Sequence, residues 1–321
     1  MNQDTLSRLP ARIALVGPTA ASKTAVAIAL SKQLPLELIS ADSMQVYRHM
    51  DIGTAKPTSE EQAAARFHLI DVVNPDESWT LSDFQREGTL KCEEIAARNN
   101  TPLIVGGTGL YSRALTEDLR IPITPPNEEL REKWRKISEE FGTHTLYAAV
   151  LGIDPEAAAR IHINDAKRLI RVLEVFEYQG RTISELHAEN RDHAEKQDVL
   201  LFGLNFADRD LLYSRINKRV EVMMEQGFLR EVEELLASGY SPELNPMQSL
   251  GYRHLSQVLL GNMKLDDAVD LLKRDTRHFA RRQLIWFRAD QRIRWIEMDS
   301  LTTEEAAENI CSVIMEARSE K

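Results

Sequence analysis

Cysteine is scarce in this chain: Cys92 and Cys311 are the only two among 321 residues. They lie far apart and lack the spacing of metal ligands, so neither a disulfide-stabilised scaffold nor a zinc module is expected. No apolar run approaches the length of a membrane span. The N-terminal residues MNQDTLSRLPAR lack the apolar core of a signal peptide. We therefore expect a cytoplasmic protein without a membrane partner.

Internal repeats and low-complexity tracts are also missing. With 43% hydrophobic and 28% charged residues the composition is globular, and a length of 321 residues corresponds to about two domains. The net charge of −10 gives no general attraction for nucleic acid, although a local basic cluster can still bind a phosphate backbone. We expect a monomer.

The most informative segment, IALVGPTAASKT at 13–24, is typical of an apolar strand followed by a phosphate-binding turn and a helix. The turn nearly matches the P-loop pattern G-x-x-x-x-G-K-S/T. Its backbone N–H groups and the helix N-terminus favour an anion, while Lys23 can reach phosphate oxygens and the Thr24 hydroxyl can bind Mg²⁺. The predicted phosphate-binding residues are Gly17, Pro18, Thr19, Ala20, Ala21, Ser22, Lys23 and Thr24.

Two further motifs place polar side chains beside this turn. Asp42 follows the apolar run LELI at 36–39, where a carboxylate can act on a group held over the phosphates. Thr108, in VGGTGLY at 105–111, can cap a helix or donate a hydrogen bond to the anion. The two glycines before Thr108 are expected to leave room for a ligand. A phosphate site beside a carboxylate indicates an enzyme that transfers a group from a phosphorylated donor.

Ser22 departs from the P-loop pattern, because it stands where the pattern has glycine. Its Cβ can crowd the phosphates, or it can strain a backbone conformation that glycine adopts freely. If it crowds them, Ser22→Gly should tighten donor binding. An ordinary strand–turn–helix that binds nothing is the alternative interpretation of the segment.

The hydrophobic periodicity predicts an α/β fold, a P-loop NTPase-like parallel sheet flanked by helices. Strands are predicted at 13–16, 36–39, 102–105, 199–206 and 292–298. Helices are predicted at 23–34, 81–98, 208–226, 228–237, 265–288 and 303–317. Ligands of such a sheet bind at the carboxyl ends of its strands, which is where the three motifs lie.

A helical insertion domain is predicted between 122 and 190. The prolines of PITPPNEEL mark its start, and the charged helical segments that follow contain no strand candidate. The expected organisation is a first part of the core at 1–121, the insertion at 122–190, and the rest of the core with C-terminal helices at 191–321.

Two basic clusters offer surfaces for nucleic acid. The larger lies on one side of a predicted helix and consists of Arg274, Arg277, Arg281 and Arg288. The smaller consists of Lys167, Arg168 and Arg171. Trp286 within the larger cluster can stack on unpaired bases. Solvent-facing helices that bind nothing are the alternative for both clusters.

Seven segments carry a more specific signal: GPTAASKT, ISADSMQVYRHMDIGTAKP, HLIDVVNPDES, LIVGGTGLY, IHINDAKRLIRVLEV, LGYRHL and RHFARRQLIWFR. Their content and order resemble the bacterial tRNA dimethylallyltransferases, also called tRNA isopentenyltransferases. The resemblance covers residues 12–297, and the second and fourth segments are far more specific than the P-loop. Eukaryotic members carry a C-terminal zinc finger, for which this chain has too few cysteines.

The resemblance implies transfer of a dimethylallyl group from dimethylallyl diphosphate to N6 of the adenosine 3′ of the anticodon, in tRNAs that read codons beginning with U. Asp42 matches the family's proposed general base, and Thr108 matches a threonine that hydrogen-bonds the diphosphate. Arg219 matches an arginine near the diphosphate, and Mg²⁺ on Thr24 is the expected cofactor. The implied partners are dimethylallyl diphosphate and the tRNA anticodon stem-loop.

The resemblance also implies contacts with tRNA. The insertion would grip the anticodon stem, and the target base must leave the anticodon stack to reach Asp42. The residues that match tRNA-binding segments are Asp42, Ser43, Met44, Gln45, Lys167, Arg168, Arg171, Ser249, Gly251, Tyr252, Arg253, His254, Arg281, Arg282, Gln283, Trp286 and Arg288.

Three functions remain open from the sequence. The first is tRNA dimethylallyl transfer. The second is an adenylate isopentenyltransferase acting on a free nucleotide, which would need neither the basic helix nor the insertion. The third is an RNA-binding relative whose transferase site is weakened by Ser22. A P-loop kinase fits less well, because the downstream motifs resemble those of prenyl transfer.

Overall fold

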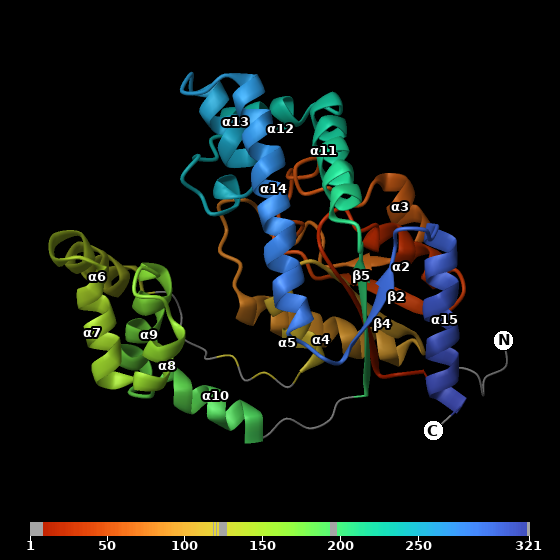
Figure 1. Ribbon diagram of the computed structural model, residues 1–321, viewed down its shortest axis with the longest axis horizontal. Coiled ribbons are helices and arrows are strands. Elements are labelled where there is room, and N and C mark those ends of the chain that lie inside the picture. The colour runs from red at the N-terminus through yellow and green to blue at the C-terminus, as the bar shows by residue number, and fades with distance from the viewer. Residues whose placement is uncertain (1–8, 118, 120, 122–126, 193–197, 320–321) are drawn as a thin grey trace. The chain divides into compact units, whose positions relative to one another are not determined.

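The computed structural model describes residues 9–117, 119, 121, 127–192 and 198–319. The chain forms two compact units, one made of Met1–Thr116 with Gln197–Lys321 and the other of Glu117–Lys196 (Figure 1). The second unit contains the segment predicted as an insertion at 122–190. The proline-rich start of that segment, at 122–126, lies outside the described residues.

Six parallel strands among the described residues form the sheet of the first unit, in the order β3-β2-β4-β1-β5-β6. They are β1 (Arg12–Val16), β2 (Leu36–Ser40), β3 (Phe67–His68), β4 (Thr101–Gly106), β5 (Val199–Asn205) and β6 (Ile293–Glu297). Five of them were predicted from apolar runs, so the parallel α/β fold is confirmed. The prediction missed β3, because two residues are too few to show a periodicity.

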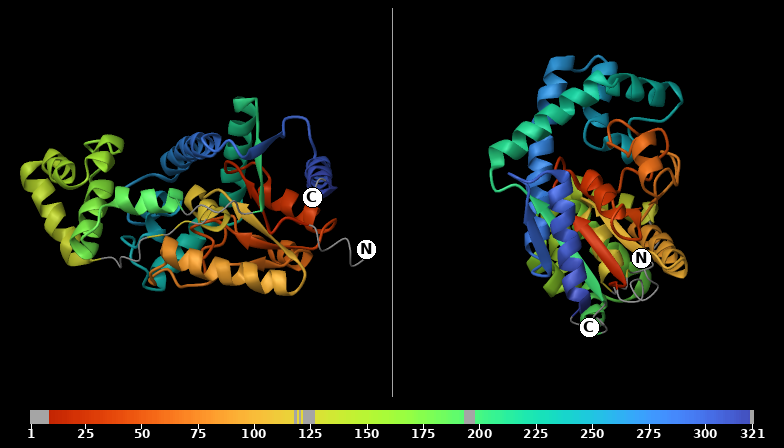
Figure 2. Two further views of the ribbon diagram at one scale, coloured as in Figure 1. Left: turned by 90° about the horizontal axis from the view of Figure 1, so that it is seen from below. Right: turned by 90° about the vertical axis from the view of Figure 1, so that its right-hand side faces the viewer.

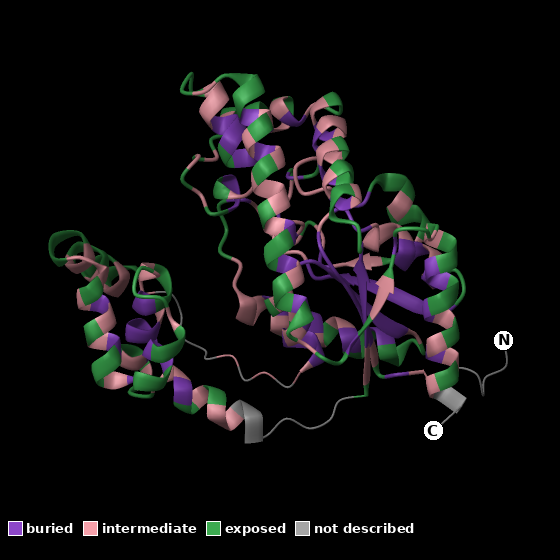
Figure 3. Cartoon of the chain, in the orientation of Figure 1, coloured by how far each residue is buried: buried purple, intermediate pink, exposed green. Residues whose placement is uncertain are grey.

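Helices cover both faces of this sheet. They are α2 (Lys23–Ser31) and α15 (Thr303–Ser319) on one face, and α4 (Leu81–Ala97) and α5 (Gly109–Thr116) on the other. Ile13 and Leu15 of β1 belong to the hydrophobic core shared with α2 and α15. Because side chains alternate along a strand, Ala14 and Val16 point to the opposite face. Figure 2 (right) shows the layers, and Figure 3 shows that the central strands are buried.

A second hydrophobic core lies among helices that follow β5. These elements are α11 (Arg209–Glu225), α12 (Phe228–Ala237), the 3₁₀ turn Pro246–Gln248, α13 (Tyr252–Leu259) and α14 (Leu265–Arg288). Figure 1 shows them gathered on one side of the sheet. Val220, Phe228, Tyr252 and Leu272 pack there with Val46 from the segment after β2. The segment that carries Asp42 is therefore held between the sheet and these helices.

The helices predicted by residue range in the first unit are present, and α5 begins directly after Thr108, where a helix start was expected. Two short helices were missed. The missed helices are α3 (Ser59–Ala64) and α13. Thr58 caps α3 through a capping box with Glu61, because Glu61 N donates to Thr58 Oγ1 and Thr58 N donates to the Glu61 carboxylate. Both helices are at most eight residues long, which is shorter than the window of about 11 or more residues over which a helical periodicity is recognised.

Glu231 of α12 anchors the turn that follows the Asp42 segment. Its carboxylate accepts hydrogen bonds from the backbone N–H groups of Asp51 (2.9 Å), Ile52 (2.7 Å) and Gly53 (3.1 Å). It also accepts a hydrogen bond from the Tyr252 hydroxyl (2.6 Å). One side chain thus satisfies three backbone donors of a turn that has no other regular structure.

Glu231→Ala is expected to lower the free energy of unfolding by about 3 kcal/mol, because it leaves partly buried N–H groups without an acceptor. Urea unfolding measures the change. The matched control is Glu233→Ala, since Glu233 is exposed on the same helix, and its effect should stay within about 0.5 kcal/mol. Equal losses in the two variants would show that Glu231 does not anchor the turn.

The described residues of the second unit form helices and the turns that connect them. Its helices are α6 (Glu128–Phe141), α7 (Thr143–Ile153), α8 (Pro155–Arg160), α9 (Ala166–Gln179) and α10 (Ile183–Asp192). Leu146, Val150 and Leu169 lie in its hydrophobic core. The buried Glu174 accepts hydrogen bonds from Arg131 Nε (2.8 Å) and Arg171 Nη1 (2.6 Å), which pair its charge. No helix in the described part of the chain is long and apolar enough to cross a membrane.

Candidate active site

Three turns meet at the carboxyl ends of the adjacent strands β2, β4 and β1. The P-loop at 17–24 follows β1, the segment at 41–45 follows β2, and Thr108 follows β4. Ala41 N donates to Val105 O (2.7 Å) and Thr108 N donates to Ala41 O (3.2 Å), so the last two turns are bonded to each other. The structure thus brings together the three motifs that the sequence predicted at this edge.

The P-loop contains two residues other than glycine in the left-handed region. These are Ala20 (φ 63°) and Ser22 (φ 61°, ψ 21°), and such conformations cost about 1–3 kcal/mol each. The backbone strain anticipated at Ser22 is therefore present. The Ser22 hydroxyl accepts a hydrogen bond from Arg215 of α11, whereas Thr19 lines the neighbouring cavity. Ser22 is thus oriented towards α11, which argues against crowding of a ligand.

Two cations lie beside the P-loop. Lys23 Nζ donates to Pro18 O (2.6 Å), and Arg219 of α11 lines the cavity. Burial, followed by the positive charge of Arg219, lowers the pKa of Lys23 to about 7, against the opposing effect of Asp42. Burial also lowers the pKa of Arg219. An anion bound beside these groups would relieve both the desolvation and the mutual repulsion, so the site favours a multiply charged anion.

Affinity for an anion is expected to fall as the pH rises above 7. A multiply charged anion bound here would stabilise the Lys23 ammonium, so the pKa of Lys23 would be higher in the complex than in the free protein. Below pH 7 both forms are protonated and affinity is at its maximum; above pH 7 binding must take up a proton, which weakens it by up to tenfold per pH unit.

Titration calorimetry at pH 7, 8 and 9 with a non-reactive organic diphosphate as the anion measures this slope. Lys23→Arg is the control, because an arginine stays protonated over the whole range. An equal slope in the wild type and in Lys23→Arg would show that the titrating group is not Lys23.

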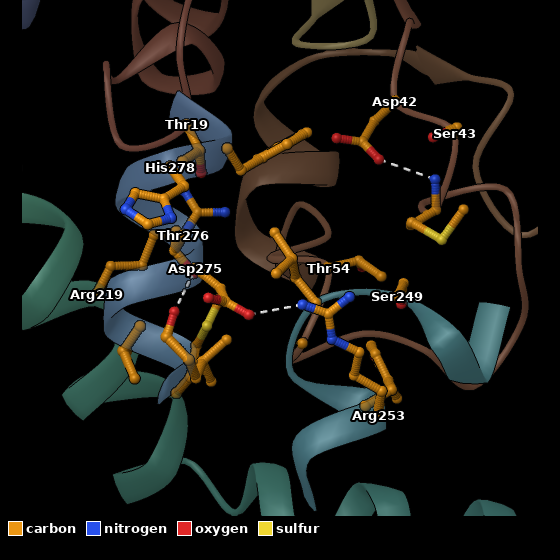
Figure 4. A pocket seen from close by; sticks show the side chains of 18 of the residues that line it. Thr19, Asp42, Ser43, Thr54, Arg219, Ser249, Arg253, Asp275, Thr276 and His278 are labelled. Atoms are coloured by element: carbon orange, nitrogen blue, oxygen red, sulfur yellow. Dashed lines mark hydrogen bonds and ion pairs between the residues drawn. The ribbon is translucent and has the colours of Figure 1, made fainter. Parts of the chain in front are cut away.

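Asp42 lies across the site from Arg219. Its Oδ1 accepts a hydrogen bond from Met44 N (2.9 Å). Ser43 N donates to Thr108 Oγ1 (3.1 Å), while the Thr108 hydroxyl lies 3.4 Å from Ser43 Oγ, too far for a strong bond. The Thr108 proton can therefore turn to a better acceptor. Figure 4 shows Asp42 and Ser43 on one side of the site and Arg219 on the other.

The glycines before Thr108 do not leave room for a ligand, which corrects the sequence prediction. A Cβ on Gly106 would lie 2.1 Å from Ala41 O, and a Cβ on Gly107 would lie 2.2 Å from Gln283 Nε2. The space is thus taken by the backbone after β2 and by a side chain of α14. These glycines allow close packing of the site's own parts.

A cavity of about 550 Å³ extends from the P-loop to α13 and α14. Its polar end is lined by Thr19, Asp42, Thr108 and Arg219. Its apolar wall is formed by Val220, Met223, Phe228 and Leu272, all of them buried. The volume suits a small organic ligand, and the combination suits one with an anionic group and an apolar part.

Two glutamines predicted as tRNA contacts are bound within the protein. Gln283 is 7% exposed; its Oε1 accepts from Thr19 N and its Nε2 donates to Gly107 O, both at 2.9 Å. Gln45 Oε1 accepts from Ser40 Oγ (2.8 Å), and Gln45 Nε2 donates to the backbone carbonyls of Thr54 and Ala55. Both side chains brace the site. Gln283 lies 264 positions after Thr19 in the chain, and no local sequence signal predicts their hydrogen bond.

The segment around α13 is divided between the cavity and the interior. Ser249 and Arg253 line the cavity, and Arg253 forms an ion pair with Asp275 (2.7 Å). Three residues of the same segment are buried, namely Gly251, His254 and Tyr252, and of these Tyr252 also lines the cavity. Only part of the predicted tRNA-binding segment is therefore open to a ligand in this structure.

The sequence predicted that the basic residues of α14 lie on one side of the helix. In the structure they do not all share one exposed side. Arg281 and Arg288 are exposed, whereas Arg277 Nη1 donates to Asn217 of α11 (2.7 Å). Arg282 is exposed and lines the cavity, and Trp286 is 39% exposed. These side chains offer charge and an aromatic ring close to the cavity.

The smaller basic cluster lies on α9 in the second unit. Lys167 and Arg168 are exposed. Arg171 differs, because its guanidinium pairs with the buried Glu174. Lys167 and Arg168 therefore remain the candidates for a phosphate contact from this helix, and Arg171 primarily compensates a buried charge.

Two protein-family models match the chain. The model described as IPP transferase matches residues 45–290, and the model described as isopentenyl transferase matches residues 11–75. Among similar proteins, tRNA dimethylallyltransferase 1 of Syntrophotalea carbinolica is 48% identical over 92% of this chain and 93% of its own length. The tRNA dimethylallyltransferase of Acetivibrio thermocellus is 42% identical over 91% and 93%.

Solved structures of similar proteins cover the same length. The tRNA isopentenylpyrophosphate transferase of Bacillus halodurans superposes with a TM-score of 0.71 at 37% identity, over 96% of each chain. A eukaryotic dimethylallyltransferase acting on tRNA superposes with a TM-score of 0.80 at 26% identity, over 97% of this chain and 80% of the other.

Proposed function

The chain belongs to the IPP transferase family, together with the tRNA dimethylallyltransferases. From this premise we propose that it transfers a dimethylallyl group from dimethylallyl diphosphate to N6 of the adenosine 3′ of the tRNA anticodon. The observation that carries the proposal is the cavity that Arg219 lines on one side and Asp42 on the other, with Lys23 close enough for both charges to act on it. An anion-binding side and a carboxylate across from it are what this transfer needs.

The donor side of the cavity would bind the diphosphate. P-loop N–H groups, Lys23 and Arg219 place positive charge there, and the Thr108 hydroxyl can donate to a phosphate oxygen. As the allylic C–O bond breaks, negative charge grows on the departing diphosphate. The same groups then stabilise the leaving group more strongly than they stabilise the bound donor, which accelerates the step.

Asp42 would act on the adenosine. The N6 amine is a poor nucleophile, because its lone pair is delocalised into the ring. The Asp42 carboxylate can orient the amine towards the allylic carbon and accept the N6 proton as the N–C bond forms. The hydrogen bond from Met44 N fixes the carboxylate through Oδ1, which leaves Oδ2 for the substrate.

The residues present fit a Mg²⁺ ion that is bound together with the donor. The Thr24 hydroxyl and diphosphate oxygens are the hard ligands that Mg²⁺ prefers. In the described part of the chain, no group of three or more His, Cys, Asp or Glu side chains could hold a metal by itself. The ion would therefore be shared between Thr24 and the donor, where it would neutralise diphosphate charge.

Exposed basic residues support tRNA as the acceptor. Arg281, Arg282 and Arg288 on α14 and Arg253 on α13 can contact phosphates, and Trp286 can stack on a base. Lys167 and Arg168 of the second unit can add contacts to the anticodon stem. A flipped adenosine would enter the cavity past Ser249 and Arg253. We propose that this activity takes place in the cytoplasm, where tRNA is available.

The test is transfer of radiolabelled dimethylallyl diphosphate, with Mg²⁺, to an unmodified anticodon stem-loop that carries adenosines 3′ of the anticodon. AMP is offered in parallel as the alternative acceptor. Label in the RNA alone is expected. Label in AMP would assign the protein to the nucleotide-level isopentenyltransferases instead. A stem-loop that binds without being labelled would identify a weakened RNA-binding relative.

A further inference from the structure

Arg215 of α11 contacts the P-loop at two points, although no sequence motif singles it out. Its Nε donates to Ala20 O (3.1 Å) and its Nη2 donates to Ser22 Oγ (2.5 Å). The guanidinium carbon lies 5.1 Å from the centre of the Phe206 ring, which holds it from one face. Arg219 lies one turn later on the same helix and lines the cavity. One helix therefore presents one arginine to the ligand and another to the loop.

The two residues that Arg215 contacts are the two strained residues of the loop. Ala20 and Ser22 both have φ near +60°, where a Cβ is unfavourable and glycine is not. Such a conformation persists only when the surroundings hold it. The planar guanidinium can bond both residues at once because its donors form a rigid fork. Arg215 therefore restrains the loop at Ser22, the position at which the P-loop pattern has glycine.

We propose that Arg215 is a positioning residue that latches the serine-containing P-loop in its diphosphate-binding conformation. The inference rests on the proposed function, since the ligand is taken to be the donor diphosphate. The loop binds an anion through N–H groups that must point into one cavity. If Ser22 relaxed from φ 61° to an ordinary conformation, the peptide that follows it would turn and the Lys23 N–H would leave that arrangement. The two hydrogen bonds from Arg215 prevent this relaxation of the loop.

A double-mutant cycle tests the latch through the dissociation constant of the thio analogue of dimethylallyl diphosphate, with Mg²⁺. Arg215→Ala is expected to raise this constant about tenfold, the effect of one charge-assisted hydrogen bond. In the Ser22→Gly background the same change should raise it less than about threefold, because the hydroxyl and the strain at position 22 are both gone and only the bond to Ala20 O remains. Equal effects in the two backgrounds would overturn the proposal.

Two further variants distinguish the effect of the Arg215 hydrogen bonds on donor affinity from an effect of its charge and from a general loss of stability. Arg215→Lys keeps the charge but cannot bond both partners with one planar fork, so its donor affinity should resemble that of Arg215→Ala. Wild-type affinity in Arg215→Lys would show that only the charge matters, which would overturn the latch. Arg209→Ala is the matched control, since Arg209 is exposed at the start of the same helix, and it should bind the donor as the wild type does.

The kinetic signature separates positioning from a merely structural role. Arg215→Ala should raise the KM for dimethylallyl diphosphate while the KM for the stem-loop and kcat at saturating donor change less than about threefold. A uniform loss of kcat with an unchanged donor KM would overturn the proposal. Failure of the wild type to transfer at all would instead contradict the proposed function, so the two failures are distinguishable.

Discussion

Asp42→Asn is expected to lower kcat about 10²–10⁴-fold, the contribution of a positioned general base. The amide oxygen can still accept the hydrogen bond from Met44 N, so the local backbone should stay in place. The amide cannot accept the N6 proton, and the loss should therefore appear in the chemical step. Single-turnover transfer to the stem-loop measures it, and donor affinity should remain within about threefold of the wild type.

Asp71→Asn is the matched control for the base. Asp71 also follows a strand at the carboxyl edge, but it is exposed and pairs with Lys56 (2.6 Å). Its loss should change kcat less than about threefold. Wild-type turnover in Asp42→Asn would remove the assignment of Asp42 as the base, and a large loss in Asp71→Asn would show that turnover is sensitive to any carboxylate near this edge.

Lys23→Met is expected to weaken donor binding about 10²-fold, within the range for losing one partner of a close charge pair. The methionine has a similar length and no charge, so the P-loop should keep its shape. Arg219 would then face the diphosphate without the second cation. Calorimetry with the thio analogue measures the loss, and the affinity for the stem-loop should be unchanged.

Lys32→Met distinguishes the loss of a contact in the site from a general effect of the lower net charge. Lys32 caps the C-terminus of the same helix and is exposed, so the change in net charge is identical. Its donor affinity should equal that of the wild type. Donor binding by Lys23→Met at wild-type strength would exclude Lys23 as a diphosphate contact, because no other group of the variant replaces its charge.

At Ser22 the motif alone predicted two possible consequences and could not decide between them. The P-loop pattern identified the position, and the chemistry of a Cβ predicted either crowding or strain. The structure has the strain, with φ at 61°, and orients the hydroxyl towards Arg215. The choice between the two outcomes depended on a helix almost two hundred residues later, which the local pattern does not contain.

The glycines of VGGTGLY illustrate a prediction that was wrong for the same reason. Their lack of side chains correctly indicated a close approach at Gly106 and Gly107. What approaches is the backbone at Ala41 and the side chain of Gln283, and not a ligand. A glycine signals that space is needed, but the identity of its occupant is a property of the assembled fold.

The sequence by itself determined the parallel sheet, its ligand-binding edge, and the family. Buried parallel strands need continuous apolar runs on both faces, and the residues directly after those strands are carried to one edge, so Lys23, Asp42 and Thr108 could be placed locally. Only the tertiary structure decided that Gln283 joins the P-loop to Gly107, that Arg215 bonds Ser22, and that Arg277 turns inward. Strand and turn signals are short-range, because they arise from neighbouring residues in the chain. Contacts from α11 and α14 arise from packing between distant segments, which leaves no periodic trace in the sequence.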